Sequence, residues 1–266
     1  MELLLFYKFS FLVAFSSASS LSILGHHQLV RGKVLEIFAL SQFALIGNLL
    51  AKLIFHSSEN GAQALIVSYV SFSLGKVLLS KIDIQKNIYG PYMVGIYLCI
   101  ISVQYLLIGF FPQLDSHMSL GFFGNMVTSS FMENIVLIVV FLVFFLLSQI
   151  YSKEISRRSL DINIFKVRPK STFDLLLFSI PLVVSLYGLG FLYTLSFLLI
   201  PNLILGTSFK SQRTSNKVIA LMAATASVVG LLLSIVFENI STSSAQILLL
   251  FIMCLILKTM LSKSHS

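Results

Sequence analysis

Charged residues are scarce in this sequence, and their scarcity excludes an ordinary soluble domain. Only 11% of the 266 residues are charged and 57% are hydrophobic, and the mean hydropathy is +0.95. About 25% of the residues of a typical soluble domain are charged. The few carboxylates all lie in loops or near the end of an apolar segment. The composition therefore predicts an integral membrane protein.

Ionisable residues are missing from the middle of the apolar segments. Ion-coupled carriers usually place such groups within the membrane, so a carrier of this kind is disfavoured and stays an alternative. A nucleotide-binding loop is missing as well, because "RGKV" and "LGKV" lack the upstream glycine and the Ser or Thr that meets magnesium. If ATP powers this protein, another chain binds it. We therefore predict no enzymatic activity and no cofactor for this chain.

Cysteine is also rare. Cys99 and Cys254 both fall in apolar runs, so neither a disulfide framework nor a paired-cysteine metal motif is present, and both are expected to be inert core thiols. The formal charge is +8, but the basic residues cluster in short connections between apolar segments. This pattern is typical of cytoplasmic loops. Membrane lipid is therefore an expected partner and nucleic acid is not.

The apolar runs predict the number and order of the membrane-spanning helices. A helix needs about 20 apolar residues to cross the hydrocarbon, and the stretch 172–206 is too long for one such helix and short for two. Its middle reads "YGLG", and the two glycines allow the backbone to turn. We predict a single transmembrane domain, residues 1–266, folded as an all-α bundle of about nine helices. They lie near 3–24, 34–55, 62–80, 90–111, 133–152, 172–187, 191–206, 218–236 and 244–262.

Charge predicts the direction of the helices. The connection 153–171 is strongly basic, so the positive-inside rule places it in the cytoplasm. Basic and non-basic connections then alternate along the chain, with the N-terminus outside and the C-terminus in the cytoplasm. The opening segment contains "FSSASS" but lacks the basic n-region of a signal peptide. The first helix is therefore expected to be retained.

Two polar features need an explanation. Gln42, in "LSQFALIG", puts a primary amide in the middle of the second apolar segment, where an unpartnered amide is costly, so something must face it. His26 and His27 form an adjacent pair. Adjacent residues point in different directions on a helix, and a loop pair needs further ligands to hold a metal. A solvated cytoplasmic loop is the favoured interpretation of this pair, with a metal contact as the alternative.

Three stretches, in the same order along the chain, resemble the permease subunits of the ABC-3 family, which serve bacterial importers of zinc, manganese and iron. "LVRGKVLEIFALSQFALIG" resembles the second helix of the family, with a basic entry, Leu40-Ser41 and a closing Gly47. "LGFFGNMVTSS" resembles a second motif through Phe123-Gly124. "SLDINIFKV" and "YGLGFLYTLSFLLIPNLILG" resemble a third, in which Leu198–Pro201 match. The resemblance covers about residues 20–262 and depends on order and spacing more than on any one motif.

This resemblance implies a multi-pass protein of the bacterial cell membrane, which is the inner membrane in a Gram-negative cell. It implies a homodimer around a central path, a cytoplasmic ABC ATPase and an extracytoplasmic metal-binding protein as partners, and divalent metal ions as cargo, with zinc or manganese favoured and iron as an alternative. The implied path residues are Phe38, Ser41, Gln42 and Asn202. The implied ATPase-coupling segment spans about 151–170 and includes Ile155, Ser156, Arg157, Arg158, Ser159 and Leu160.

The chain also departs from the family. The family's second helix carries an Asp and a His four residues apart, so both face the path and can bind a divalent cation. The matching residues here are Phe38 and Gln42. An amide oxygen is a poor zinc ligand, so the family's metal site is weakened or lost and the metal ligands stay unassigned. A degenerate paralog that acts as a non-transporting membrane scaffold is therefore a second hypothesis.

Overall fold

The computed structural model describes residues 7–55, 61–82, 89–124, 126, 129–165, 172–206, 208–209, 211–237 and 240–263. These residues form helices and turns and contain no strand, so the predicted all-α class is confirmed. The helices are α2 (Lys8–Val30), α3 (Val34–Ile54), α4 (Gly61–Ser80), α5 (Tyr89–Phe110), the short 3₁₀ helix η1 (Pro112–Leu114), α6 (Asp115–Phe123), α7 (Phe131–Ile150), α8 (Ser152–Phe165), α9 (Thr172–Gly188), α10 (Phe191–Leu205), α11 (Gln212–Val236) and α12 (Thr242–Lys263).

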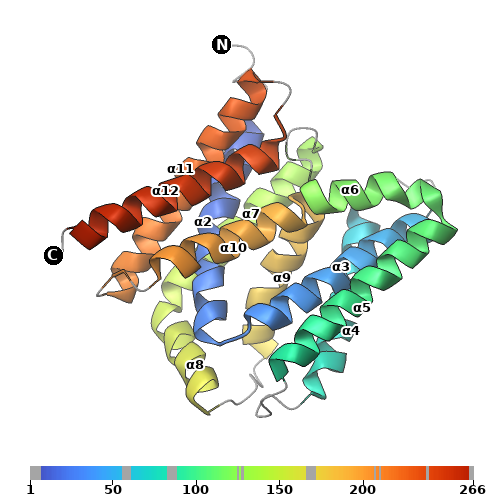
Figure 1. Cartoon of the computed structure of the whole chain (residues 1–266), viewed down its shortest axis with the longest axis horizontal. Helices are drawn as coiled ribbons and strands as arrows, with labels where there is room; N and C mark the ends of the chain where they lie inside the picture. The colour runs from blue at the N-terminus through green and yellow to red at the C-terminus, as the bar shows by residue number, and fades with distance from the viewer. Residues whose placement is uncertain are drawn as a thin grey trace.

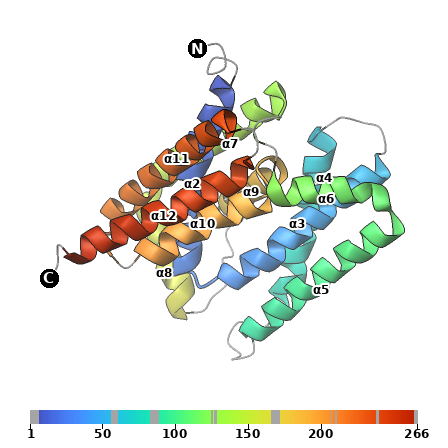
Figure 2. The ribbon, with the colours of Figure 1, turned by 45° about the horizontal axis from the view of Figure 1, so that its top comes forward.

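The long helices form two groups that lie on opposite sides of the molecule (Figures 1 and 2). In one group, α3 packs against α4 and α5. In the other, α2 packs against α10 and α11, and α12 packs against α10 and α11. Helix α9 joins the groups, because it contacts α3 and α4 on one side and α2, α7 and α10 on the other.

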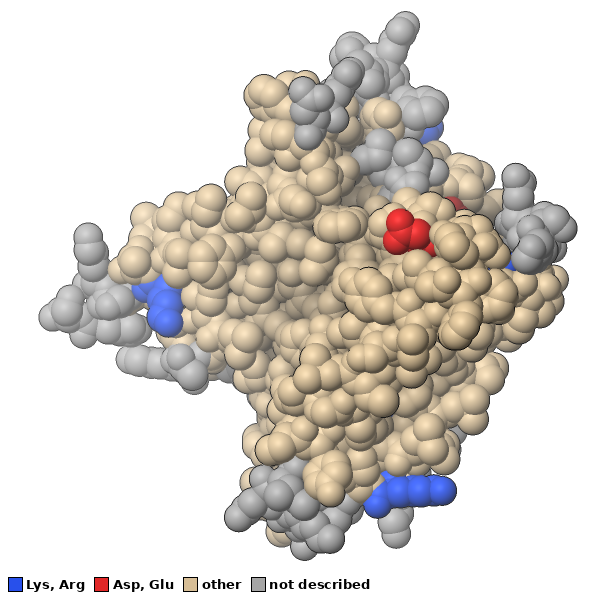
Figure 3. Space-filling view, turned by 45° about the vertical axis from the view of Figure 1, so that its right-hand side comes forward, with Lys and Arg blue, Asp and Glu red and all other residues tan. Residues whose placement is uncertain are grey.

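Seven of these helices have the length and hydropathy to cross a membrane: α2, α3, α4, α5, α7, α11 and α12. Leu176–Gly188 and Phe191–Leu205 are apolar but shorter. Each of the nine segments predicted from the sequence thus contains a helix in the described part of the chain. Most of the face in Figure 3 is uncharged, as expected for a surface that meets lipid. The number of crossings and the sides of the two termini stay predictions.

A sharp break separates α9 from α10, as the "YGLG" stretch predicts. Gly190 has a φ of +85° and Gly124, which follows α6, has a φ of +74°, a region that residues with a side chain rarely adopt. A Cβ on Gly124 would meet the backbone oxygen of Leu189, and one on Gly190 would meet the backbone of Gly124. The two glycines therefore let two turns, far apart in the sequence, touch backbone to backbone.

The first helix extends further than predicted. It ends at Val30 instead of near residue 24, so His26 and His27 lie in α2 and are buried. Their interpretation as a solvated loop is wrong. Gly25 lets this part of α2 lie close to α10, since its Cα faces the backbone oxygen of Leu198 and leaves no room for a side chain. The last turns of α2 are thus packed inside the protein. Residues 3–6 of the predicted helix lie outside the described residues.

Three further details differ from prediction. The sequence predicts only a connection where η1 and α6 lie. The structure forms helices there, since Pro112 and Asp115 are typical of helix starts. Helix α11 begins at Gln212 instead of near residue 218. Cys254 is buried as expected, but Cys99 is exposed, because α5 packs on α3 with one face and turns the other outward.

Candidate functional site

The predicted path residues of α3 lie on the face that packs against α5. Phe38 and Gln42 are one helical turn apart and so share a face. The ring of Phe38 meets the ring of Tyr97 edge-on, with centroids 5.9 Å apart. Gln104, also on α5, donates from Nε2 to the backbone oxygen of Gln42 at 3.1 Å. Within the single chain, a helix of the same chain therefore covers this face.

The side-chain amide of Gln42 is completely buried, and neither its oxygen nor its nitrogen has a hydrogen-bond partner. The amide oxygen of Gln104 is buried without a partner as well. Ser41 differs, because its hydroxyl donates to the backbone oxygen of Ile37 at 2.7 Å. An unpaired buried polar group costs about 1–3 kcal/mol. The buried amides of Gln42 on α3 and Gln104 on α5 thus keep unused hydrogen-bonding capacity.

Asn202, the fourth predicted path residue, lies on the other side of the molecule. Its Nδ2 donates to the backbone oxygen of Ser22 on α2 at 2.8 Å and to that of Leu198 at 2.9 Å. The residue is buried, and its Oδ1 has no partner. The structure therefore does not bring Asn202 together with Gln42. In this chain Asn202 ties α10 to α2 beside the close approach at Gly25.

The predicted coupling segment forms α8, which is anchored through its inner face; residues 166–170 of that segment lie outside the described residues. Ile155 and Ser159 are buried and Ser156 is half-buried. Arg31, in the turn after α2, donates from Nε to the Ser159 hydroxyl at 3.0 Å. The Arg31 guanidinium also lies over the ring of Phe178 on α9, 4.2 Å from its centroid. These contacts hold α8 against the end of α2, which itself packs on α9.

The outer face of α8 is charged and partly apolar. Arg157 is exposed and lies 4.0 Å from Asp161, and Arg158 donates to Glu154 at 2.8 Å. Exposed pairs four residues apart contribute only about 0.3–0.5 kcal/mol, so a partner protein can replace them at little cost. Leu160, between these pairs, is also exposed. The arrangement gives a rigid helix with an accessible face of arginine and leucine.

Sequence reasoning missed several residues that shape this region. Arg31 was assigned only to a basic entry, and no local pattern shows that its guanidinium is buried against Ser159 and Phe178. The Nδ1 of His27 lies 3.5 Å from the same Ser159 hydroxyl. Gln104 carried a detectable signal, because a glutamine inside an apolar run needs a partner. Its pairing with Gln42 depends on how α3 and α5 pack, which the sequence alone does not give.

A resident metal centre is not evident within the described residues, since no three His, Cys, Asp or Glu side chains cluster there. Near Gln42, α5 places the ring of Tyr97 against Phe38 and the amide of Gln104 on the backbone oxygen of Gln42. The arrangement offers oxygen atoms to a passing ion and no strong zinc ligand.

No protein-family model matches the sequence, and no curated protein matches it. Among solved structures, the chain is similar to PsaBC from Streptococcus pneumoniae in complex with Fab. The TM-score is 0.76 at 21% sequence identity, and the match covers 94% of this chain and 90% of that chain. The two chains therefore share one fold along nearly their whole length. The resemblance to ABC-3 permeases that the sequence motifs indicate is thereby confirmed at the level of the fold.

Proposed function

We propose that this chain is the membrane-spanning permease subunit of an ATP-binding-cassette importer for divalent metal ions. The observation that carries the proposal is the fold shared with PsaBC over 94% of the chain, together with the ordered motifs that resemble ABC-3 permeases. Zinc or manganese is the favoured cargo and iron the alternative. In this assignment the chain does not hydrolyse ATP, and a separate subunit does.

The ATPase binds, in this proposal, to the outer face of α8. A coupling element must transmit force, so it must be fixed to the membrane helices and still present a free face. The buried contact between Ser159 and Arg31 meets the first need. The exposed side chains of Arg157 and Leu160 meet the second. Such a face suits a partner surface that combines carboxylates with an apolar pocket.

The cargo path runs, in this proposal, along the α3 face that carries Gln42, in a homodimer supplied by an extracytoplasmic metal-binding protein. The unpaired amide atoms of Gln42 and the free oxygen of Gln104 support this assignment, because amide oxygens suit transient contact with a hard cation. A weak site favours rapid release. Tight and selective capture is then the task of the external protein.

The direct test is metal uptake by cells that express the chain with its ATPase, combined with copurification of the two subunits. Replacing Arg157 and Arg158 by Glu reverses the charge of the outer face of α8 and should reduce the recovered ATPase without reducing membrane insertion. Lys258→Glu, a single charge reversal on α12, is the control and should retain the ATPase. Unchanged copurification of the Arg157→Glu, Arg158→Glu variant would reassign α8 to a merely solvated segment.

A non-transporting scaffold is the second candidate function. Two observations favour it: Phe38 and Gln42 stand where the family has Asp and His, and the described residues contain no metal-ligand cluster. The uptake assay separates the two candidates. A scaffold binds its partners and leaves the cellular content of zinc and manganese unchanged, whereas a permease raises at least one of them only when the ATPase is active.

The proposed topology has its own test. A cysteine placed at Ser241, before α12, should react with an impermeant thiol reagent applied to intact cells. A cysteine at Ser211, before α11, should react only after the membrane is opened. Reaction of position 211 from outside would overturn the orientation, and with it the cytoplasmic position of α8.

A further inference from the structure

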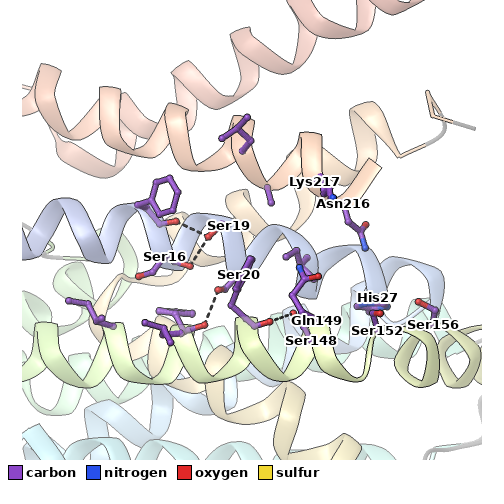
Figure 4. A pocket seen from close by; sticks show the side chains of 18 of the residues that line it. Ser16, Ser19, Ser20, His27, Ser148, Gln149, Ser152, Ser156, Asn216 and Lys217 are labelled. Carbon is purple, nitrogen blue, oxygen red and sulfur yellow. Dashed lines mark hydrogen bonds between the residues drawn. The ribbon is translucent and has the colours of Figure 1, made fainter. Parts of the chain in front are cut away.

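A groove of about 740 Å³ runs along α2 between α7 and α11, away from the α3 face that carries Gln42. Helix α2 forms its floor, α7 and α11 form its walls, and the start of α8 closes one end (Figure 4). Its volume is that of a typical small-molecule site, which measures about 300–1,000 Å³. The proposed transport function does not use it.

The lining of the groove changes in character along its length. The end away from α8 is apolar and includes Leu12, Phe15, Ile138, Leu142 and Phe145. The end at α8 is polar, and the labelled side chains of His27, Gln149, Asn216 and Lys217 lie toward it in Figure 4, whereas Ser16, Ser19 and Ser20 lie further from it. That end is lined by His27, Ser148, Gln149, Ser152, Lys153, Ser156, Asn216 and Lys217. The groove is thus amphipathic along the direction of α2.

The length of the groove suits a lipid chain. Leu12 and His27 both line it, and at 1.5 Å per residue they are about 22 Å apart along α2. This is most of the roughly 30 Å hydrocarbon thickness of a bilayer. Leu12 and Phe15 are about half exposed, so the apolar end opens toward the surrounding membrane.

The serines of the floor leave room for a chain without offering it free polar groups. Ser16 donates to the backbone oxygen of Leu12 at 2.7 Å, and Ser19 donates to that of Phe15 at 2.8 Å. Ser20 donates across the groove floor to the backbone oxygen of Phe141 at 3.1 Å. Their hydroxyls are therefore satisfied, and the small side chains create a shallow, effectively apolar channel.

The polar end carries positive charge that is not neutralised. Lys153 and Lys217 are exposed, and neither has an ion-pair partner among the residues that the structure describes. The buried Oδ1 of Asn216, beside Lys217, lacks a donor. The site thus offers two cations to an anion and one acceptor to a hydroxyl group. Basic pockets between membrane helices recognise anionic headgroups in this way.

We propose that this groove is a binding site for an anionic phospholipid, with one acyl chain along α2 and the phosphate between Lys153 and Lys217. Asn216 Oδ1 accepts a hydrogen bond from a headgroup hydroxyl, so a phosphatidylglycerol-type headgroup fits best. The bound lipid fills the space between α7 and α11 and neutralises the start of α8. Lipid composition then affects how firmly α8 is held in place.

The absence of tryptophan from the sequence allows a clean measurement. The full-length protein with Leu221→Trp, which places one tryptophan in the groove, is reconstituted into phosphatidylcholine vesicles that contain brominated phosphatidylglycerol. A matched variant, Leu98→Trp, places the tryptophan on the exposed surface of α5. We expect quenching of the Leu221→Trp protein at lower phosphatidylglycerol fractions than quenching of the Leu98→Trp protein. Equal quenching of the two would contradict a specific site.

Two further variants locate the lipid. Lys153→Ala with Lys217→Ala should weaken the preference for phosphatidylglycerol by about fivefold for each lysine, the effect of one basic residue near an anionic headgroup, whereas Lys258→Ala should not. Ser16→Phe fills the apolar end and should abolish the preference, whereas Ser102→Phe, at an exposed serine of α5 with the same local hydrogen bond, should leave it intact. An unchanged preference in both groove variants would overturn the proposal. The proposal would also be overturned if Ser16→Phe abolished dimer formation and left lipid quenching unaltered, because a second copy of the chain would then occupy the groove.

Discussion

The two sides of the molecule treat a buried glutamine differently. On α12, Gln246 donates from Nε2 to the backbone oxygen of Ser227 at 2.9 Å and to its hydroxyl at 3.2 Å. The Ser227 hydroxyl bonds to that of Tyr193 at 2.9 Å, and Tyr193 bonds to Ser17 at 2.9 Å. On α3, Gln42 is equally buried, and its amide bonds to nothing.

This difference suits a scaffold on one side and, in the proposed function, a working surface on the other. The chain of bonds from Gln246 to Ser17 joins α12, α11, α10 and α2 into one unit, in which only the Gln246 Oε1 stays without a partner. The α3 side retains an amide that raises the energy of the folded chain without contributing to its packing. Such a cost is usual where a polar group serves a function that packing does not require. We therefore expect mutations on the two sides to differ in kind.

The largest expected effect concerns close packing. Gly25→Ala places a Cβ against the backbone oxygen of Leu198 and 2.9 Å from Nδ2 of Asn202, so α2 and α10 must separate. We expect a loss of about 3 kcal/mol in the free energy of unfolding, measured by denaturant titration of the purified protein in detergent. Gly95→Ala is the control on α5, where nothing lies within 4 Å, and should raise stability by up to about 1 kcal/mol. Equal effects would show that the close approach of α2 to α10 at Gly25 does not stabilise the protein.

The two glutamines give the sharpest pair. Gln246→Leu removes both bonds to Ser227 and should cost about 1–2 kcal/mol of unfolding free energy, the upper part of the range for hydrogen bonds between membrane helices. Gln42→Leu removes no side-chain bond and a buried unpaired amide, so it should be neutral or stabilising while it reduces metal uptake. If Gln42→Leu unfolds the protein as readily as Gln246→Leu, then Gln42 is a packing residue.

A smaller effect should follow from restoring metal ligands. Phe38→Asp with Gln42→His puts a carboxylate and an imidazole one turn apart, a spacing that can chelate a divalent ion. We expect the purified double variant to bind zinc about tenfold more tightly than the natural protein, equivalent to about 1.4 kcal/mol, as measured by equilibrium dialysis. Gln42→His alone should give a smaller gain. Tight zinc binding by the natural protein without its external partner would contradict this account of α3.

The sequence predicted the helical class, the segments that form the long helices and the break between α9 and α10, because these follow from the hydrophobic runs and from glycine. The resemblance also implied a coupling segment at about 151–170, where α8 lies. The sequence did not predict the burial of His27 and Arg31. Both lie in the stretch "GHHQLVRGK", whose polar residues and glycines are typical of a loop. Their burial depends on the packing of α8 and α9 against the end of α2, which no local pattern records.

The candidate path was predictable only in part. Gln42 was identifiable as a polar residue in an apolar helix. The hydrogen bond of its neighbour Ser41 is local, since the hydroxyl donates to a backbone oxygen one turn earlier in the same helix. The contact between Gln42 and Gln104 was not, because it joins residues of α3 and α5 whose register is set by packing. Asn202 shows the opposite case, since the motif suggested a path residue and the structure uses its amide to bond α10 to α2.

The accessibility of position 42 to water tests the central claim most directly. In a protein with Cys99→Ala and Cys254→Ala, Gln42→Cys is compared with Ser17→Cys, a completely buried residue of the scaffold side. With the ATPase hydrolysing ATP in membrane vesicles, we predict that a small water-soluble thiol reagent labels position 42 and leaves position 17 unlabelled. Labelling of position 42 only by a lipid-soluble reagent, or no labelling at either position, would contradict the claim that Gln42 lines the path.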